Sequence, residues 1–241
     1  MGLLLVWLVF LFCRDSQLMI RWRVVVVFLC FWFNSAWATE SSSNGKLILD
    51  KNNIKIWSYK VPKSSLNGFK ATTTVKSSLS GLVALITDTQ RASRWLYRTG
   101  SIDVLARDDN QQFFTIRVIT DVPWPFTDRE ALVDVRISQD PKTNRVRIDS
   151  NESSNAAKYP IDECCLRMPM VKGYWLFQPL GNGLVEVTMS GHADPGGRIP
   201  AGLVNFLIQE HPYNTLQGLR RVIGDASYQK VQYPLIVELA N

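Results

Sequence analysis

The sequence predicts an α+β fold in which a curved antiparallel β-sheet is wrapped around one long C-terminal helix. Strand-like segments bounded by turn residues fill the region 102–194, and no helical pattern separates them. The segment 199–223 then repeats apolar residues mostly at three- and four-residue steps, which is the spacing of one helix face. Because the connections are mostly short and lack helices, neighbouring strands must run largely antiparallel.

A hairpin and a helix precede these strands. The segments 54–62 and 67–78 are rich in β-branched residues, and the first of them also in aromatic residues, so the two predict a β-hairpin. The apolar period then changes to a helical one in 78–98, with Ser78 or Ser80 as the N-cap.

The strands of the main sheet and the last helix follow in order. The expected strands are 102–108, 111–121, 129–138, 144–151, 171–180 and 184–194. In the helix at 199–223, Pro200 lies in the first turn, where a helix tolerates proline, whereas Pro212 is expected to kink or interrupt it. A curved sheet around such a helix is a helix-grip arrangement, and it can enclose a hydrophobic cavity instead of a solid core.

Residues 1–38 have the order of a secretory signal and are not domain material. Two arginines precede an uninterrupted apolar run, and a small-x-small sequence ends at Ala38. We therefore expect translation to start at Met19, cleavage after Ala38, and export to the periplasm or the medium. The alternative is that the apolar run 3–12 belongs to an uncleaved anchor that tethers the protein to a membrane, although a span needs roughly 20 residues.

The remainder is interpreted as one domain with short flanks. We expect a linker at 39–46, a ligand-binding domain at 47–232 and a C-terminal tail at 233–241. The sequence has 27 basic and 21 acidic residues, and the basic residues are scattered along it. Because no basic run with interleaved aromatic residues occurs, nucleic acid is not expected as a partner. A monomer with transient contact to an anionic membrane surface is the expectation.

Two cysteines, Cys164 and Cys165, remain after the predicted signal. Neighbours in an extended segment point to opposite faces, so the pair is interpreted as two unbonded thiols. The spacing of histidines, cysteines and carboxylates is not that of a metal site, and we expect no metal and no cofactor.

Four features after residue 120 form a pattern. They are the proline-aromatic-proline corner DVPWPFTDRE at 121–130, a Gly-x-Trp strand that ends near Pro179, the turn Asp194-Pro195-Gly196-Gly197, and the helix start Ile199-Pro200. In this order and spacing they resemble the StAR-related lipid transfer (START) family. The resemblance implies a helix-grip domain whose sheet and C-terminal helix enclose a tunnel for one lipid, typically a sterol or a phospholipid.

The corner itself has a structural explanation. Prolines give no N–H to a neighbouring strand, so they end the ladder and turn the chain. Trp124 and Phe126 are then expected to cover an end of the sheet, and Arg129 to anchor the corner through an acid such as Asp128 or Glu130.

The strand after the corner departs from some lipid-transfer members, which carry an inward charged residue there. The matching position is Val135, and Arg136 lies one place further, on the opposite face of an alternating strand. Alternation predicts Ala131, Val133 and Val135 as inward residues. This leaves Arg117 as the candidate for an inward cation, against the commoner outward arginine.

The candidate ligand-binding residues are mainly apolar positions of the strands and the last helix, each with ordinary core packing as its alternative role. They are Trp95, Phe114, Arg117, Trp124, Tyr174, Met189, His192, Val204, Phe206 and Leu207. His192, at a strand end, is included as a polar contact to a ligand. His211 is interpreted as local structure before Pro212.

Two function classes follow. The first is an exported, non-enzymatic lipid-binding or lipid-transfer protein that shields one hydrophobic molecule from water, with no catalytic residues. The second is an enzyme of the helix-grip superfamily, a cyclase or hydrolase acting on a hydrophobic substrate, with His192 and Asp194 as acid and base. The lack of a nucleophile motif such as Gly-x-Ser-x-Gly favours the first. A sensor that changes partner when its cavity fills is a third, weaker alternative.

Overall fold

The computed structural model describes residues 45–239, apart from the side chains of Ala201, Asn205 and Phe206. The predicted signal at 1–38 and nearly all of the predicted linker lie outside the described residues. Within the described part, no helix is both long enough and apolar enough to cross a membrane.

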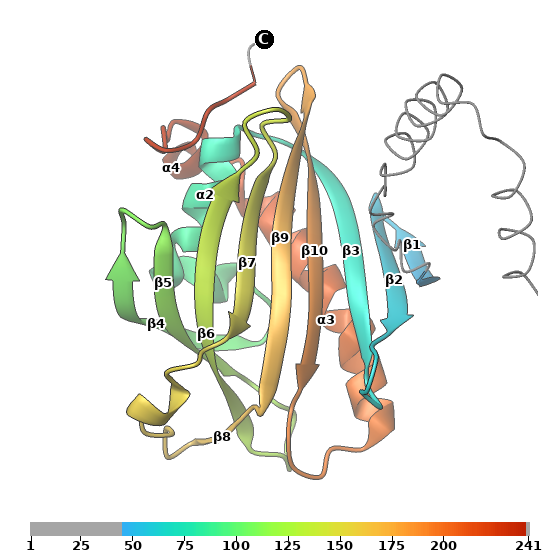
Figure 1. Ribbon diagram of the computed structural model, residues 1–241. Helices are drawn as coiled ribbons and strands as arrows, with labels where there is room; N and C mark the ends of the chain where they lie inside the picture. Colours follow the sequence, from blue (N-terminus) through green and yellow to red (C-terminus); the bar gives the residue numbers. More distant parts are fainter. Residues whose placement is uncertain (1–44, 240–241) are drawn as a thin grey trace, which may run out of the picture. The chain divides into compact units, whose positions relative to one another are not determined.

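One curved sheet dominates the fold (Figure 1). Its order is β1-β2-β3-β10-β9-β7-β6-β5-β4, all neighbours are antiparallel, and β8 pairs with β6 in parallel. The strands are β1 (Lys46–Lys51), β2 (Ile54–Lys60), β3 (Asn67–Lys76), β4 (Thr99–Asp108), β5 (Phe113–Thr120), β6 (Asp128–Gln139), β7 (Val146–Glu152), β8 (Cys165–Arg167), β9 (Met170–Gly181) and β10 (Leu184–Asp194). The α+β helix-grip prediction is confirmed.

The helices lie on one face of this sheet (Figure 1). They are α2 (Leu79–Thr87), α3 (Ala201–Val222) and α4 (Ala226–Gln229), with the short 3₁₀ turn η1 (Thr89–Arg94). A second 3₁₀ turn, η2 (Ala156–Lys158), lies in the connection between β7 and β8. Of the two N-cap candidates for α2, Ser78 is the one that accepts the hydrogen bond, from Gly81 N at 3.0 Å. α3 continues through Pro212, so this proline does not interrupt the helix.

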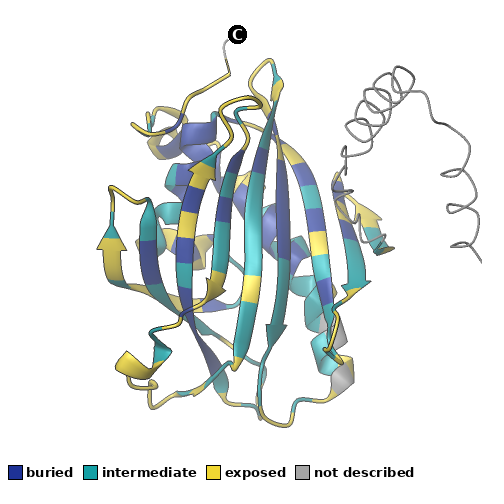
Figure 2. Cartoon of the chain, viewed as in Figure 1, coloured by how far each residue is buried: buried dark blue, intermediate teal, exposed yellow. Residues whose placement is uncertain are grey.

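The core fills the space between α2, the C-terminal half of α3 and the middle of the sheet. Leu216 and Leu219 of α3 and Phe177 of β9 are fully buried there. Buried residues alternate with more exposed ones along several strands, as expected for a sheet with one face covered (Figure 2).

The residues after α4 pack onto the domain. Glu238 accepts hydrogen bonds from the N–H groups of Leu79 at 2.9 Å and Ser80 at 2.8 Å, so its carboxylate binds the free donors at the start of α2. Ile236 is buried, and Val237 pairs with the side-chain amide of Gln139.

The expectation of two free thiols is wrong, because Cys164 and Cys165 form a disulfide bond with each other. The expectation assumed an extended segment. Cys164 instead lies in a turn that the Cys165 N–H closes on the Asp162 carbonyl at 3.1 Å, and only Cys165 belongs to a strand. The two side chains are therefore not held on opposite faces.

Candidate functional site

A cavity of about 380 Å³ lies between the sheet and the N-terminal half of α3. Its walls come from β3–β7, β9 and β10, from η1 and the turn after it, and from α3. Most of the lining side chains are apolar, so the site is suited to a hydrophobic body and not to an ion.

Alternation along the strands brings these side chains together. Ala131, Val133 and Val135 of β6 face the cavity, as the sequence predicts, and Ile116 and Phe114 lie opposite Val133 and Val135 in the register of β5. On β9 and β10, Trp175 pairs with Met189, and both line the cavity. The indole of Trp175 meets that of Trp95 edge to face at 6.0 Å.

One stripe of α3 closes the cavity. Val204, Leu207, Ile208 and His211 follow each other at helical spacing, and all four line it. Further along, the helix backbone touches the turn after η1, since a Cβ on Gly218 would lie 2.2 Å from the carbonyl oxygen of Trp95. A side chain at position 218 would push the helix away from this wall.

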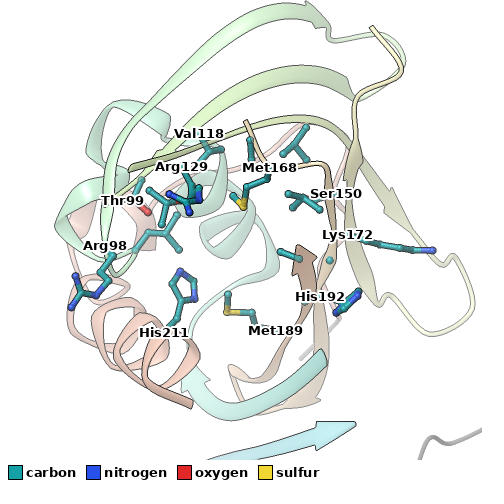
Figure 3. A pocket seen from close by; sticks show the side chains of 18 of the residues that line it. Arg98, Thr99, Val118, Arg129, Ser150, Met168, Lys172, Met189, His192 and His211 are labelled. Carbon is teal, nitrogen blue, oxygen red and sulfur yellow. The ribbon is translucent and has the colours of Figure 1, made fainter. Parts of the chain in front are cut away.

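Polar groups gather at one side of the cavity (Figure 3). His211 points from α3 into the space, while Thr99 and Arg129 lie across from it. Burial lowers the pKa of His211 to about 4, and the positive charge of Arg98 acts in the same direction. At neutral pH, His211 is therefore an uncharged imidazole. Its ring meets that of Tyr97 edge to face, with 6.4 Å between the ring centres.

Arg129 is buried, and it binds backbone carbonyls. Its Nε donates to Pro195 O at 2.6 Å, its Nη2 to Gly196 O at 3.3 Å, and its Nη1 to Thr127 O. The expected anchoring through Asp128 or Glu130 is wrong, because these carbonyls surround the guanidinium instead. Arg129 thus fastens the β5–β6 loop to the β10–α3 connection at one end of the cavity.

Glu130, the residue after Arg129, is fully buried, and its carboxylate binds two arginines from other strands. Arg167 donates to Glu130 Oε1, Arg117 Nε lies 3.4 Å from Oε2, and the Asp162 N–H donates to Oε2 at 2.8 Å. Arg117 also donates to Pro160 O at 3.1 Å. The prediction of Arg117 as an inward cation is therefore wrong. Its two neighbours, Ile116 and Val118, face the cavity, and strand alternation turns Arg117 to the other side.

Trp124 does not line the cavity. The Pro-Trp-Pro corner closes through Phe126 N–H to Pro123 O at 3.1 Å and Val122 N–H to the Asp128 carboxylate at 2.9 Å, and Trp124–Pro125 is a cis peptide. The Trp124 side chain is left 91% exposed, so the prediction that it lines the tunnel or covers the sheet end is wrong.

The other predicted residues divide into three groups. Trp95, Phe114, Met189, Val204 and Leu207 line the cavity. Tyr174 and His192 also border it, but strand alternation directs their side chains to the face of the sheet opposite to that of Trp175 and Met189. The Tyr174 ring stacks on Arg147 at 3.9 Å, and His192 lies beside Lys172, which points away from the cavity (Figure 3). The side chain of Phe206 lies outside the described residues.

His192 and Asp194 have separate partners. His192 Nδ1 lies 3.4 Å from Asn67 O, and the Asp194 carboxylate accepts the Gly196 N–H at 2.9 Å. The acid-base pairing considered from the sequence is therefore not formed.

His211 was predicted to be local structure before Pro212, whereas it lines the cavity. Its signal was the spacing: His211 lies seven residues after Val204 and four after Leu207, on the same helix face. Arg98, in the turn that leads into β4, and Thr99, the first residue of β4, were not predicted either, because nothing in their local pattern shows which side of the sheet they face.

Among residues 45–239, one set of candidate metal ligands lies close together, Asp162, Cys164 and Cys165, with ligand atoms within 4.8 Å of one another. Both sulfurs are used in the disulfide, so this set fits a structural bond and not a metal ion.

Comparison with known proteins agrees with this architecture. No family model matches the sequence. An uncharacterized protein of Pseudomonas aeruginosa is 27% identical over 175 residues, which cover 73% of this chain and 84% of the relative.

Two solved structures share the fold. One is the STAR-related lipid transfer protein of Xanthomonas axonopodis, with a TM-score of 0.67, 24% identity, and coverage of 74% of this chain and 98% of that one. The other is human StAR-related lipid transfer protein 5, with a TM-score of 0.67, 12% identity, and coverage of 85% and 95%. With its open curved sheet, its closing C-terminal helix and these neighbours, the chain has the START fold.

Proposed function

We propose that this protein binds one hydrophobic ligand, a lipid or a sterol-like molecule, in the cavity between its sheet and α3, and that it acts as an exported lipid-binding or lipid-transfer protein. The observation that carries the proposal is the apolar cavity of about 380 Å³ in a fold shared with lipid transfer proteins.

Burial of apolar surface supplies the affinity. Each Å² of ligand surface removed from water contributes about 25 cal/mol, and a cavity lined by valine, isoleucine, methionine and tryptophan side chains removes most of a ligand's surface. Such binding needs no catalytic group. The contacts of His192 and Asp194 with backbone groups give no support to the enzyme alternative.

Release of a lipid requires contact with a membrane, and one end of the molecule is suited to it. Trp124 in the β5–β6 loop is 91% exposed, and Leu166 in β8, which pairs with the start of β6, is 40% exposed. Both lie at the end where Arg129 joins the β5–β6 loop to the β10–α3 connection (Figure 1). A tryptophan is favoured at a membrane interface because its ring is apolar and its N–H is polar.

The test is native mass spectrometry of the protein expressed with its own N-terminal sequence and purified from the exported fraction, followed by lipid extraction. A one-to-one adduct that extraction identifies as one intact lipid class is expected. Protein that stays empty after incubation with lipid extracts of its host, or that carries a chemically altered product, would contradict the carrier function. The measured mass also tests cleavage after Ala38, since an uncleaved signal gives a larger chain.

A further inference from the structure

A second pocket, of about 360 Å³, adjoins the apolar cavity. It lies between residues 93–99 and the C-terminal half of α3, and its lining is mostly polar. We call it the arginine pocket, because Arg94, Arg98 and Arg221 line it. The residues that border both spaces are Trp95, Leu96, Arg98, Thr99 and Asp121.

The same helix lines both spaces on consecutive turns. The apolar cavity takes Val204, Leu207, Ile208 and His211 from α3. The arginine pocket takes Asn214, Gln217, Gly218 and Arg221, so the stripe continues without a gap at helical spacing. His211 is therefore the last α3 residue of the apolar cavity before the lining becomes polar.

The arginine pocket has an excess of positive charge. Three arginines line it against one carboxylate, that of Asp121. Arg94 lies 3.8 Å from Asp225, whereas neither Arg98 nor Arg221 forms an ion pair within residues 45–239. Arg221 donates to the Arg94 carbonyl at 2.8 Å, which holds its guanidinium beside the turn after η1.

Arg98 lies at the junction of the two spaces. Its guanidinium points away from the centre of the apolar cavity and lies 5.2 Å from the centre of the Tyr97 ring (Figure 3). Its Nε is buried and has no hydrogen-bond partner among the described residues. A small rotation of this side chain would direct an unpaired donor to a group that leaves the cavity beside His211.

We propose that the ligand is a single-chain amphipath with an anionic head group, whose tail lies in the apolar cavity and whose carboxylate or phosphate lies in the arginine pocket. This rests on the proposed function above, because it assigns the head group of a ligand whose tail occupies that cavity. Arg98 and Arg221 bind the anion, since a guanidinium offers paired donors in the geometry of carboxylate and phosphate oxygens.

The size of the cavity agrees with one chain. A volume of about 380 Å³ is near the lower end of the roughly 300–1,000 Å³ of small-molecule pockets. One acyl chain suits such a space, whereas two chains side by side need a larger one. A diacyl phospholipid is therefore expected to bind more weakly than a single-chain lipid with the same charge.

The experiment compares ligands that differ only in the head group. Oleate, oleoyl lysophosphatidic acid and oleyl alcohol compete for a fluorescent fatty-alcohol probe at pH 7.5, with the full exported protein. Oleate or the lysophosphatidic acid is expected to bind at least about tenfold more tightly than the alcohol, as charge-assisted hydrogen bonds imply. The preferred anion shows whether the pocket takes a carboxylate or a phosphate.

Variants then assign the pocket. In Arg98→Gln/Arg221→Gln, the affinity for the preferred anion is expected to fall about tenfold, while that for oleyl alcohol stays within twofold. The control is Arg136→Gln, on the outer face of β6, which is expected to change neither. If the double variant does not fold, the affinities of the wild type for the anion and for the alcohol still test the head-group assignment. The preference for the anion is expected to decrease as the salt concentration rises, because exposed charge contacts weaken in salt.

The outcomes separate the two proposals. If oleyl alcohol binds as tightly as both anions, the anionic head group is wrong and the lipid-binding function stands. If the probe itself and every competitor fail to bind, the lipid-binding function fails and the head-group assignment fails with it.

Discussion

At the scale of single residues, Glu130 links segments that are distant in sequence. Its buried carboxylate binds Arg167, Arg117 and the backbone of Asp162, and Arg167 also donates to the carbonyls of Ala156 and Tyr159. One charge on β6 therefore holds the whole connection between β7 and β9 against the sheet.

Replacing Glu130 tests this role. Glu130→Gln leaves two arginines beside a neutral amide, and we expect a loss of roughly 3 kcal/mol in the free energy of unfolding, measured by urea denaturation. The control is Asp109→Asn, which breaks the exposed pair with Arg107 and is expected to cost less than about 1 kcal/mol. Equal losses in the two variants would contradict the role of Glu130.

Two glycines of α3 give opposite predictions. A Cβ at Gly218 meets the Trp95 carbonyl at 2.2 Å, whereas a Cβ at Gly202 meets no atom within 4 Å. Gly218→Ala is expected to destabilise the protein by about 1–3 kcal/mol through overpacking, and Gly202→Ala to stabilise it by up to about 1 kcal/mol through helix propensity. Thermal unfolding measures both, and a stabilised Gly218→Ala would show that this close contact is wrong.

The pH dependence of stability follows from His211. Its pKa is about 4 in the folded protein and 6.5 in its ordinary range, so between these values the unfolded chain binds more protons. Stability is full above about pH 6.5 and falls as the pH falls through 4, by at most about 3 kcal/mol. The groups that face this ring are Arg98, Tyr97 and, across the cavity, Arg129.

The variant His211→Gln removes this contribution. As the pH is lowered from 7 to 4.5, the free energy of unfolding, measured by urea denaturation, is expected to fall more in the wild type than in the variant. A difference that does not change with pH would contradict the depressed pKa of His211.

At the scale of elements, local pattern predicted those elements whose period is regular. The apolar repeat of α3 and the alternation of β6 gave the correct faces for Val204, Leu207, Ala131 and Val133. β1 was missed because Lys46–Lys51 is short and has charges at both ends; the predicted linker ends at residue 46, and no strand was expected before residue 54. β8 was missed because three residues carry no period, and its pairing with β6 is set by Glu130 and Arg167.

The site was predicted less completely than the fold. Most of the apolar residues predicted to line the cavity do so, whereas Trp124 is exposed and Arg117 faces away from the cavity. The orientation of Trp124 depends on the backbone of the Pro-Trp-Pro corner, and that of Arg117 on a buried partner that is remote in sequence, Glu130. The arginine pocket joins residues 93–99 to residues of α3 more than a hundred positions later, a contact that local sequence does not reveal.

The exposed β5–β6 loop gives a prediction at this scale. Trp124→Ala is expected to change stability by less than about 0.5 kcal/mol, because the side chain is 91% exposed, and to slow lipid transfer between vesicles several-fold. Leu180→Ala, in an exposed residue near the β9–β10 turn at the opposite end of the sheet, is the control and is expected to transfer at the wild-type rate. Equal transfer rates in the two variants would exclude Trp124 as the membrane contact.

At the scale of the whole molecule, the two ends of α3 have different surroundings. Its C-terminal half packs on a solid core through Leu216 and Leu219, while its N-terminal half covers a cavity. Part of the sheet's inner face is therefore covered by α3 without being filled by side chains. The C-terminal half of α3 therefore anchors the helix to the core, and its N-terminal half leaves the cavity open.

Native mass spectrometry of a cavity-filling variant tests whether the lipid lies between the sheet and α3. Val133→Trp places an indole inside the cavity from β6, and the control Arg136→Trp places the same side chain on the outer face of the same strand. We expect wild type and Arg136→Trp to carry one lipid per chain, and Val133→Trp to be folded and empty. A Val133→Trp protein that still carries its lipid at full occupancy would show that the ligand does not lie in this cavity.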